Sequence, residues 1–316
     1  MTADYPEVDW DERLEEDCRT LIESAILEDL ENQLDWTTIA LVDDEATATA
    51  HVVARSPGVL AGIRTVDLVL ETTQADLQWQ PAAEDGERLR AGQIVGTLSG
   101  NARDLLTLER TMLNFLGPLC GIATLTAQFV AAVAGTKARV YDTRKTTPGW
   151  RRLEKYAVRC GGGHNHRLGL YAGVMIKDNH LAFWTAQDKS LAAAIPVVRQ
   201  MLASAEPRTA DDQPLLVEVE VDSLSQLRDV LPAQPDIVLL DNMSLDQLTA
   251  AVALRNELAP QVELEASGGV NLRSIGEIAR TGVERISSGA LTHSATSLDV
   301  ALDWAHVPAG PIQDDK

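Results

Sequence analysis

The chain has 316 residues, of which 45% are hydrophobic and 23% are charged, and its formal net charge is −20 at pH 7. This composition is that of a globular protein with a large core, and it excludes a disordered, collagen-like or coiled-coil chain. The acidic balance argues against nucleic acid and anionic membranes as partners. Three cysteines without a CxxC spacing favour a reducing, cytoplasmic location and argue against a disulfide framework.

The first third of the chain changes between helical and strand patterns. Residues 12–34 have apolar side chains at helical spacing, which predicts a helix. Residues 46–100 contain short alternating runs separated by Pro-Gly, Asp-Gly and Ala-Gly pairs, which is typical of β-strands joined by turns. We therefore expect a small β-rich module that begins with a helix.

A helical pattern returns at residues 104–133, and the Gly117-Pro118 pair predicts a break in it. The uncharged stretch 111–136 is long enough to span a bilayer. Its threonines, its Asn and Gln residues and the predicted break favour a buried pair of helices instead.

The second half of the chain repeats a pattern of strand and helix. From residue 215 onward the apolar runs start 21, 26 and 21 residues apart, which predicts βα units and a parallel sheet. We expect a barrel rather than a doubly wound sheet, because no GxGxxG follows the first strand and polar residues end several strands. The predicted strands are residues 137–143, 173–177, 215–221, 236–241, 262–267 and 283–289.

Positive charge is concentrated in one segment of this acidic chain. Between Lys137 and Lys177 there are ten basic residues and two acidic ones, a local net charge of +8. A basic run is often a solvated surface, but so sharp a reversal favours a site that holds a concentrated anion. The segment lacks the interleaved aromatic residues of a nucleic-acid groove, so small, multiply charged molecules fit better.

Every predicted strand of the second half ends on polar residues. Any one of these residues could be a helix cap or part of an ordinary loop, but six in succession indicate a common site at the C-terminal mouth of a barrel. The two late Ser/Gly turns lie where barrels commonly bind phosphate. The strand ends are Asp142 to Lys145, Lys177 to His180, Glu218 with Glu220, Asp241 with Asn242, Ser267 to Gly269 and Ser287 to Gly289.

Several motifs together resemble the quinolinate phosphoribosyltransferase family. DTRKTTPGWRRLEKYAVRCGGGHNHRLGL at 142–170 is followed by VMIKDNH at 174–180, and this combination rarely occurs by chance. The resemblance covers residues 20–304. Further matching motifs are LERTMLNFLGPLCGIAT (108–124), VEVEVDSLSQL (217–227), DIVLLDNMS (236–244), EASGGVN (265–271) and ISSGALTHSA (286–295).

The resemblance implies an α/β fold with two domains. The first is an N-terminal α/β sandwich of residues 1–119 that is completed by residues 291–316. The second, residues 120–290, is an open seven-stranded α/β barrel that carries the phosphoribosyltransferase site. The resemblance also implies a cytoplasmic homodimer or higher oligomer without nucleic-acid or membrane partners.

The implied reaction converts quinolinate and phosphoribosyl pyrophosphate into nicotinate mononucleotide, pyrophosphate and CO2, in de novo NAD biosynthesis, with Mg2+ as cofactor. By resemblance, the quinolinate dianion is bound by Arg144, His166, Arg167 and, across the dimer interface, Arg110. Guanidinium groups suit this task because they pair with carboxylates through two parallel hydrogen bonds. Lys145 and Lys177 would act as point charges toward carboxylate and phosphate, with Lys145 counted among the catalytic residues.

The remaining roles concern the ribose, the metal and the phosphates. By motif position, Glu220 and Asp241 are catalytic residues that hold Mg2+ and the ribose hydroxyls, and Glu218 on the same strand face remains an alternative. The 5′-phosphate would be bound by two turns, Ser267-Gly268-Gly269 and Ser288-Gly289-Ala290.

Two other functions stay open at this point. One is a family paralogue that uses another heteroaromatic acid, such as a monocarboxylate, although such a substrate would leave cationic groups unpaired. The other is a nucleic-acid-binding protein without enzymatic activity, which would leave Glu220 and Asp241 unexplained.

Overall fold

The structure is a computed structural model that describes residues 4–186, 189–205 and 214–306. The chain divides into two compact units. The parallel-sheet unit comprises Met1–Val8, Thr126–Thr147 and Gly163–Ser294. The antiparallel-sheet unit comprises Asp9–Leu125, Pro148–Gly162 and Ala295–Lys316.

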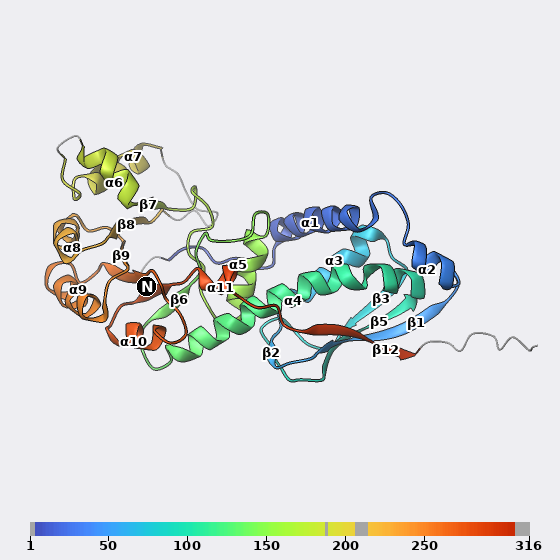
Figure 1. Ribbon diagram of the computed structural model, residues 1–316. Helices are drawn as coiled ribbons and strands as arrows, with labels where there is room; N and C mark the ends of the chain where they lie inside the picture. Colours follow the sequence, from blue (N-terminus) through green and yellow to red (C-terminus); the bar gives the residue numbers. More distant parts are fainter. Residues whose placement is uncertain (1–3, 187–188, 206–213, 307–316) are drawn as a thin grey trace, which may run out of the picture. The chain divides into compact units, whose positions relative to one another are not determined.

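A six-stranded parallel sheet forms the centre of the parallel-sheet unit, in the order β6-β11-β10-β9-β8-β7 (Figure 1). Most of its residues are buried, as in sheets that are covered on both faces. The prediction of a parallel sheet from βα units is confirmed. Its strands are β6 (Arg139–Tyr141), β7 (Val174–Ile176), β8 (Val217–Val221), β9 (Ile237–Asp241), β10 (Glu263–Ser267) and β11 (Arg285–Ser287).

The expected number of seven strands is not found in the described part of the chain. Beyond β6, His164 forms a single parallel bridge with Tyr141, and its N–H donates to the Val140 carbonyl at 2.8 Å. The ladder stops there because the next available N–H, that of His166, donates to the Asp142 side chain at 2.9 Å. A single bridge therefore lies beside β6, at one edge of the six-stranded sheet.

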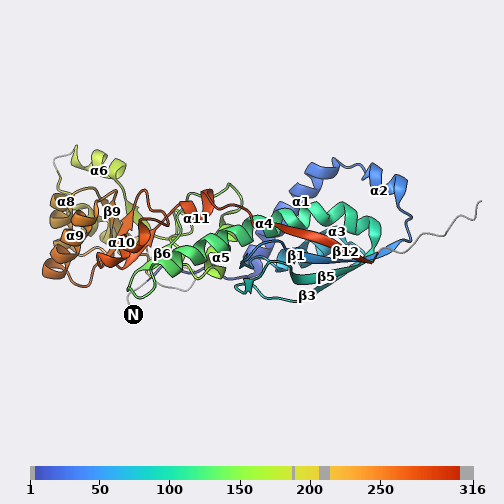
Figure 2. The same cartoon turned by 60° about the horizontal axis from the view of Figure 1, so that its bottom comes forward.

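Helices lie outside the strands of this unit: α8 and α9 flank β8 and β9 in both views (Figures 1 and 2). Local capping explains where they start. Ser223 accepts the N–H of Gln226 at the start of α8, and Ser244 and Gln247 form a capping box at the start of α9. The helices are α6 (Asp178–Thr185), α7 (Ala194–Ala205), α8 (Leu224–Val230), the 3-10 helix η1 (Leu231–Ala233), α9 (Leu245–Leu258), α10 (Ile275–Arg280) and α11 (Ala290–His293).

The antiparallel-sheet unit contains a four-stranded sheet in the order β12-β1-β5-β3 and a two-stranded sheet, β2-β4. Inward side chains of β1 alternate with more exposed ones in its first half, as expected for a sheet with one covered face. The predicted helix and short strands of this region are confirmed. The elements are α1 (Glu12–Leu30), α2 (Trp36–Leu41), β1 (Thr47–Ala54), β2 (Gly58–Val59), α3 (Arg64–Thr73), β3 (Leu77–Pro81), β4 (Arg88–Leu89), β5 (Gln93–Asn101), α4 (Ala102–Ala132), α5 (Arg151–Cys160) and β12 (Val300–His306). The last turns of α4, from Thr126 onward, belong to the parallel-sheet unit.

Helix α4 is one continuous helix of 31 residues with Pro118 inside it, so the predicted helix pair is wrong (Figure 2). Pro118 lacks the N–H that would donate to the Asn114 carbonyl four residues earlier. Next to the proline, the Gly117 carbonyl accepts the N–H of Leu298 at 2.9 Å, so the helix is contacted here by a distant part of the chain. By length and composition α4 could cross a membrane, with a mean hydropathy of 1.6 over an 18-residue window. In the structure 56% of that window is buried, as in a core helix.

The two units do not follow the predicted domain boundaries. Residues 148–162, predicted within the barrel, pack with the antiparallel-sheet unit, where Tyr156 donates to Asp85 at 2.7 Å. Conversely, the N-terminal residues up to Val8 belong to the parallel-sheet unit. Sequence patterns suggest a domain boundary between two successive elements. In the structure, contacts with residues far away in the sequence decide which unit each of these two segments joins. Residues 307–316, predicted to help complete the sandwich, lie outside the described residues.

Candidate active site

A cavity of about 660 Å3 lies at the C-terminal ends of the parallel strands. We call its lining the mouth. All of the predicted site residues except Arg110 belong to it. They are Arg144, Lys145, His166, Arg167, Lys177, Glu220, Asp241, Ser267, Gly268, Gly269, Ser288, Gly289 and Ala290.

The buried Asp142 joins the two motifs that carry most of the positive charge. Its Oδ2 atom accepts the side-chain amide of Asn165 at 2.7 Å, and its Oδ1 atom accepts the N–H of His166 at 2.9 Å. The residues that follow Asp142 at the end of β6 are thereby held beside those that follow the glycine turn. This contact brings Arg144 and Arg167, 23 positions apart in sequence, into one cavity.

His166 and Arg167 are both buried, and neighbouring backbone groups fix their positions. The Nδ1 atom of His166 accepts the N–H of Arg167 at 2.9 Å, which places the proton of the neutral ring on Nε2. The guanidinium of Arg167 donates to the Gly173 carbonyl at 3.1 Å. The ring and the guanidinium are therefore held in the wall of the mouth before any ligand arrives.

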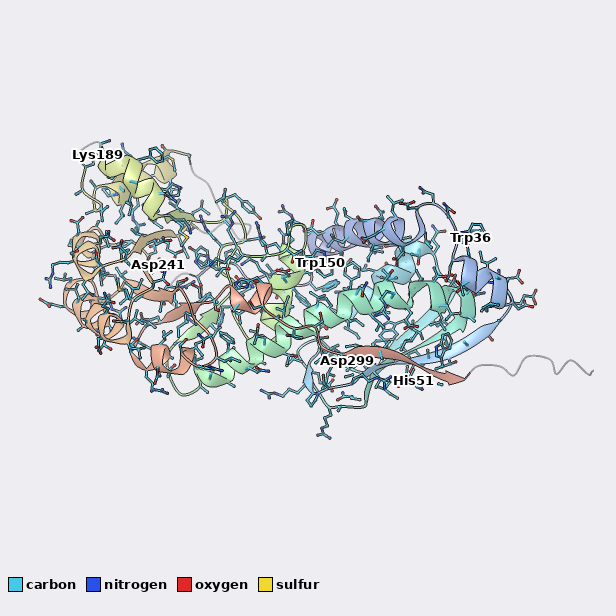
Figure 3. All side chains as sticks on the ribbon, viewed as in Figure 1. Trp36, His51, Trp150, Lys189, Asp241 and Asp299 are labelled. Atoms are coloured by element: carbon cyan, nitrogen blue, oxygen red, sulfur yellow. The ribbon has the colours of Figure 1, made fainter. Side chains whose placement is uncertain are left out.

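Two carboxylates at strand ends face these cations. Glu220 of β8 lies 3.5 Å from the Lys177 ammonium, whose side chain remains 44% exposed. Asp241, labelled in Figure 3, ends β9 and accepts the Asn242 amide at 2.9 Å. The backbone of Asn242 is left-handed, with φ of 53°. This conformation turns the amide back toward the neighbouring carboxylate.

In the two Ser/Gly turns, glycine stands at positions where atoms of other residues lie very close to the backbone. Gly268 has φ of +95°, and a Cβ atom there would lie 2.2 Å from Oδ1 of Asn242. A Cβ atom on Gly289 would lie 2.8 Å from Cδ of Lys145. Both glycines line the mouth, and backbone N–H groups in such turns suit the binding of phosphate oxygens.

Glu218 and Glu220, two residues apart on β8, occupy different surroundings. Glu218 is fully buried and is not part of the mouth lining among the described residues, whereas Glu220 is. One carboxylate oxygen each of Glu218 and Glu265 and one ring nitrogen of His166 lie within 4.8 Å of one another. This arrangement favours Glu220 for contact with a ligand and gives Glu218 a supporting position.

Comparisons with known proteins fit this geometry. The family models for the N-terminal and C-terminal domains of quinolinate phosphoribosyl transferase match residues 35–120 and 122–303. The chain is 45% identical to the nicotinate-nucleotide pyrophosphorylase [carboxylating] of Mycobacterium leprae, over 90% of this chain and 96% of that protein. The chain belongs to the quinolinate phosphoribosyltransferase family.

Other family members have similar sequences and structures. A probable nicotinate-nucleotide pyrophosphorylase [carboxylating] of Synechocystis is 39% identical over 85% of this chain and 86% of that protein. The structure of the enzyme from Francisella tularensis has a TM-score of 0.84 at 32% identity, covering 95% of this chain and all of that chain. This family member is accordingly an enzyme of the pentosyltransferase class.

Arg110 does not join the mouth lining in the described single chain. It lies on α4 in the antiparallel-sheet unit, where it is exposed. Its predicted role depends on a second subunit.

Sequence reasoning missed part of the mouth and, apart from Glu218, a second cluster. The mouth residues that it had not singled out differ in character: three are apolar, one is a buried carboxylate and one is an exposed histidine. They are Met175, Leu239, Glu265, Val270 and His293.

The second cluster, which we call the base, lies toward the N-terminal ends of the same strands. Arg285 is fully buried, and its guanidinium donates to Glu265 at 2.9 Å and to Asp4 at 2.8 Å. Burial alone would lower the pKa of Arg285, but Glu265, Tyr141 and Asp4 raise it above its ordinary value. The base consists of Asp4, Tyr5, Arg139, Tyr141, Glu218, Glu263, Glu265 and Arg285.

Proposed function

We propose that the mouth of this chain catalyses the transfer of a phosphoribosyl group from phosphoribosyl pyrophosphate to quinolinate. The products would be nicotinate mononucleotide, pyrophosphate and CO2, in the de novo synthesis of NAD. The observation that supports this most strongly is the lining of one cavity by cationic side chains, two strand-end carboxylates and two Ser/Gly turns. Each part suits a different portion of these two anionic substrates.

The cations of the mouth suit the two adjacent carboxylates of quinolinate. Arg144 and Arg167 can each pair with a carboxylate through two hydrogen bonds. Both ring nitrogens of His166 already face protein groups, Arg167 N–H at 2.9 Å and Glu218 at 3.0 Å. We therefore propose that His166 forms a rigid part of the binding surface for the dianion and also orients Arg167. Lys145 and Lys177 would supply point charges to carboxylate and phosphate groups.

Glu220 and Asp241 have the chemistry of a Mg2+ site. Mg2+ in proteins is commonly bound by one or two carboxylates together with substrate phosphates, and this pair of mouth carboxylates fits that donor set. When bound, Mg2+ would neutralise the charge of the departing pyrophosphate. The same two carboxylates would accept hydrogen bonds from the ribose hydroxyls, which would hold the sugar next to quinolinate.

The two turns, Ser267-Gly268-Gly269 and Ser288-Gly289-Ala290, are proposed to bind the 5′-phosphate through N–H groups and hydroxyls. The positive φ of Gly268 and the tight approach at Gly289 leave the backbone open to phosphate oxygens. With the phosphate and the acid both held, the pyridine nitrogen and the anomeric carbon would face each other without free rotation of either substrate.

The chemistry then needs electrostatic stabilisation and no covalent nucleophile. The ring nitrogen forms a bond to the anomeric carbon as the bond to pyrophosphate breaks. The sugar develops cationic character, which Glu220 and Asp241 would stabilise. The ribosylated ring nitrogen is positively charged, so it stabilises the electron pair that the departing CO2 leaves on the adjacent ring carbon until that carbon is protonated.

The finer architecture also belongs to this proposal. We infer that the parallel sheet, together with the single bridge at His164, forms an open barrel, supported by the contact of Arg167 with the Gly173 carbonyl beside β7. The exposed Arg110 would reach the mouth of a second subunit in a homodimer. A cytoplasmic location is proposed from the three cysteines without a CxxC spacing, and the absence of nucleic-acid or membrane partners is proposed from the net charge of −20.

A mass-spectrometric product assay tests the proposal. The protein is incubated with phosphoribosyl pyrophosphate and Mg2+, and with quinolinate or nicotinate in parallel tubes. We expect nicotinate mononucleotide from quinolinate alone, lost in Arg144→Ala and retained in Arg228→Ala, a control on the exposed side of α8. Product from nicotinate alone would assign the chain to monocarboxylates, and no product from either acid would contradict the proposed substrate.

A further inference from the structure

The N-terminal segment Asp4–Val8 belongs to the parallel-sheet unit, although 117 residues of the other unit separate it from the next part of that unit. Tyr5 is buried against Leu216 and Ile237. Glu7 accepts the N–H of Asn165 at 3.0 Å, and the Val8 N–H donates to the Asn165 side chain at 2.7 Å. The segment is thus attached to the residue that precedes His166.

The hydroxyl of Tyr5 reaches the supporting side of the mouth. It donates to Oε2 of Glu218 at 2.8 Å, and the same oxygen lies 3.0 Å from Nε2 of His166. The rings of Tyr5 and His166 are also neighbours, with centroids 4.7 Å apart. Tyr5 therefore touches His166 directly through its ring and indirectly through one shared carboxylate oxygen.

The absence of a side chain at Gly173 leaves space for the Tyr5 ring. Gly173 precedes β7, and a Cβ atom there would lie 2.7 Å from Cε1 of Tyr5. The Gly173 carbonyl is also the acceptor for the Arg167 guanidinium. One tyrosine ring is consequently enclosed by groups that hold both His166 and Arg167.

We propose that Tyr5 is a positioning residue for the acid substrate, acting through Glu218 to fix the His166 ring and, with it, Arg167. Without the hydroxyl, the buried Glu218 carboxylate loses a donor and can rotate away from His166. The ring would then sample several orientations, and the wall of the mouth would be less well formed before quinolinate binds. This inference rests on the proposed function for its substrate, but the arrangement of Tyr5, Glu218 and His166 is independent of it.

Tyr5→Phe isolates the hydroxyl, because phenylalanine keeps the ring that packs against Leu216 and Ile237. We expect the KM for quinolinate to rise about 10-fold, in line with the loss of a hydrogen bond to a charged group. The KM for phosphoribosyl pyrophosphate and kcat should stay within about twofold. Tyr171→Phe, which removes a hydroxyl from a tyrosine that is 62% exposed in the same unit, should change none of these.

A second measurement needs no substrate. In imidazole-selective NMR spectra of the full chain, the His166 ring signals are the ones that His166→Gln removes from among six histidines. Tyr5→Phe should shift or broaden those signals, while Tyr171→Phe leaves them in place.

The possible results separate the two proposals. Unchanged quinolinate KM, or unchanged His166 signals, in Tyr5→Phe would overturn the positioning role. A fall of kcat and of the melting temperature together with a rise of both KM values would overturn it as well, because it would mean general destabilisation. If the wild-type chain makes no nucleotide from quinolinate but Tyr5→Phe still moves the His166 signals, the substrate assignment fails while the support of His166 by Tyr5 stands.

Discussion

The two ends of the parallel sheet use the same kinds of charged residue for different purposes. At the base, Arg285 is fully buried and each carboxylate it contacts lies within 3.3 Å. At the mouth, Lys145 is exposed and Lys177 keeps 44% of its side-chain surface. Charges that are enclosed by partners destabilise the fold when one partner is removed, whereas exposed charges around a cavity are available to a ligand.

The balance of charge differs as well. The base contains four carboxylates, Asp4, Glu218, Glu263 and Glu265, and two guanidinium groups, Arg139 and Arg285. The mouth contains more cations than strand-end carboxylates. His166 lies between the two clusters, because it lines the mouth while its Nε2 atom lies 3.0 Å from Glu218. Substitutions of the base residues that contact Arg285 should therefore alter folding, and substitutions at the mouth should alter catalysis. Tyr5 is the exception within the base, because it reaches His166 through Glu218.

The largest effect is expected from Arg285→Met, which removes the central cation of the base. Glu265, Asp4 and Glu263 would remain buried with reduced compensation, and breaking such a buried pair costs about 3–5 kcal/mol. Chemical denaturation and scanning calorimetry should show this loss. Arg280→Met, at an exposed position on α10, should change stability by less than about 0.5 kcal/mol. Equal stability of the two variants would refute the assignment of the base to folding.

Asp241→Asn tests the mouth with an isosteric change. It removes a negative charge from the proposed metal and ribose site, so kcat/KM should fall by about 100- to 1,000-fold, the range seen when one electrostatic stabiliser is lost. The melting temperature should stay close to that of the wild type, because the carboxylate is not part of the base. Asp246→Asn, exposed in the first turn of α9, is the matched control. Retained activity in Asp241→Asn would remove this carboxylate from the proposed mechanism.

The difference between mouth and base also explains what the sequence could predict. The mouth was predictable because Arg144, Lys177, Glu220 and Asp241 each follow a recognisable apolar strand, and parallel strands deliver their ends to one edge. The parallel sheet followed from the regular spacing of βα units. Both inferences use information that is local in the sequence.

The base was not predictable because it depends on distant pairs. Tyr5 and Glu218 are 213 positions apart, and Asp4 and Arg285 are 281 apart. In the sequence, Asp4 and Tyr5 belong to an acidic N-terminal stretch without a periodic pattern. The continuity of α4 through Pro118 has a similar origin, since the contact with Leu298 lies far along the chain. Local propensity predicts a break there, and tertiary packing overrides it.

A smaller effect is expected from Gly268→Ala, which tests one of the two phosphate-binding turns proposed for the mouth. The added Cβ atom would lie 2.2 Å from Oδ1 of Asn242, at a backbone φ of +95°. Asn242 must then shift, which disturbs both the phosphate turn and the amide that contacts Asp241. We expect the KM for phosphoribosyl pyrophosphate to rise about 10-fold, a cost of roughly 1.4 kcal/mol.

A matched glycine separates the clash at Gly268 from the cost of its backbone conformation. Gly92 has φ of +79°, and a Cβ atom there would meet nothing within 4 Å. Gly92→Ala should lower stability through backbone strain and leave the kinetics unchanged. If both variants behave alike in the kinetic assay, the turn at Gly268 has no special role in substrate binding.

The smallest effect concerns the acid side of the stability profile. Burial alone would raise the pKa of Asp4, but Arg285 and the hydroxyl of Tyr141, together with the Tyr5 N–H, lower it below 3.8. A carboxyl with a lowered pKa in the folded state stabilises the fold above pH 3.8, and this contribution is lost as the pH falls through the folded-state value. Asp4→Asn should therefore melt below the wild type at neutral pH, by on the order of 2–4 °C.

The pH dependence of that difference distinguishes charge from packing. The gap between Asp4→Asn and the wild type should narrow as the pH falls below 3.8, because the wild-type carboxyl is then protonated too. Asp9→Asn, at an exposed position next to the segment, should melt like the wild type at every pH. A gap that stays constant with pH would mean that Asp4 contributes through hydrogen bonds to Tyr141 and Arg139 rather than through its charge. The base would then resemble a polar core more than an ion-pair cluster.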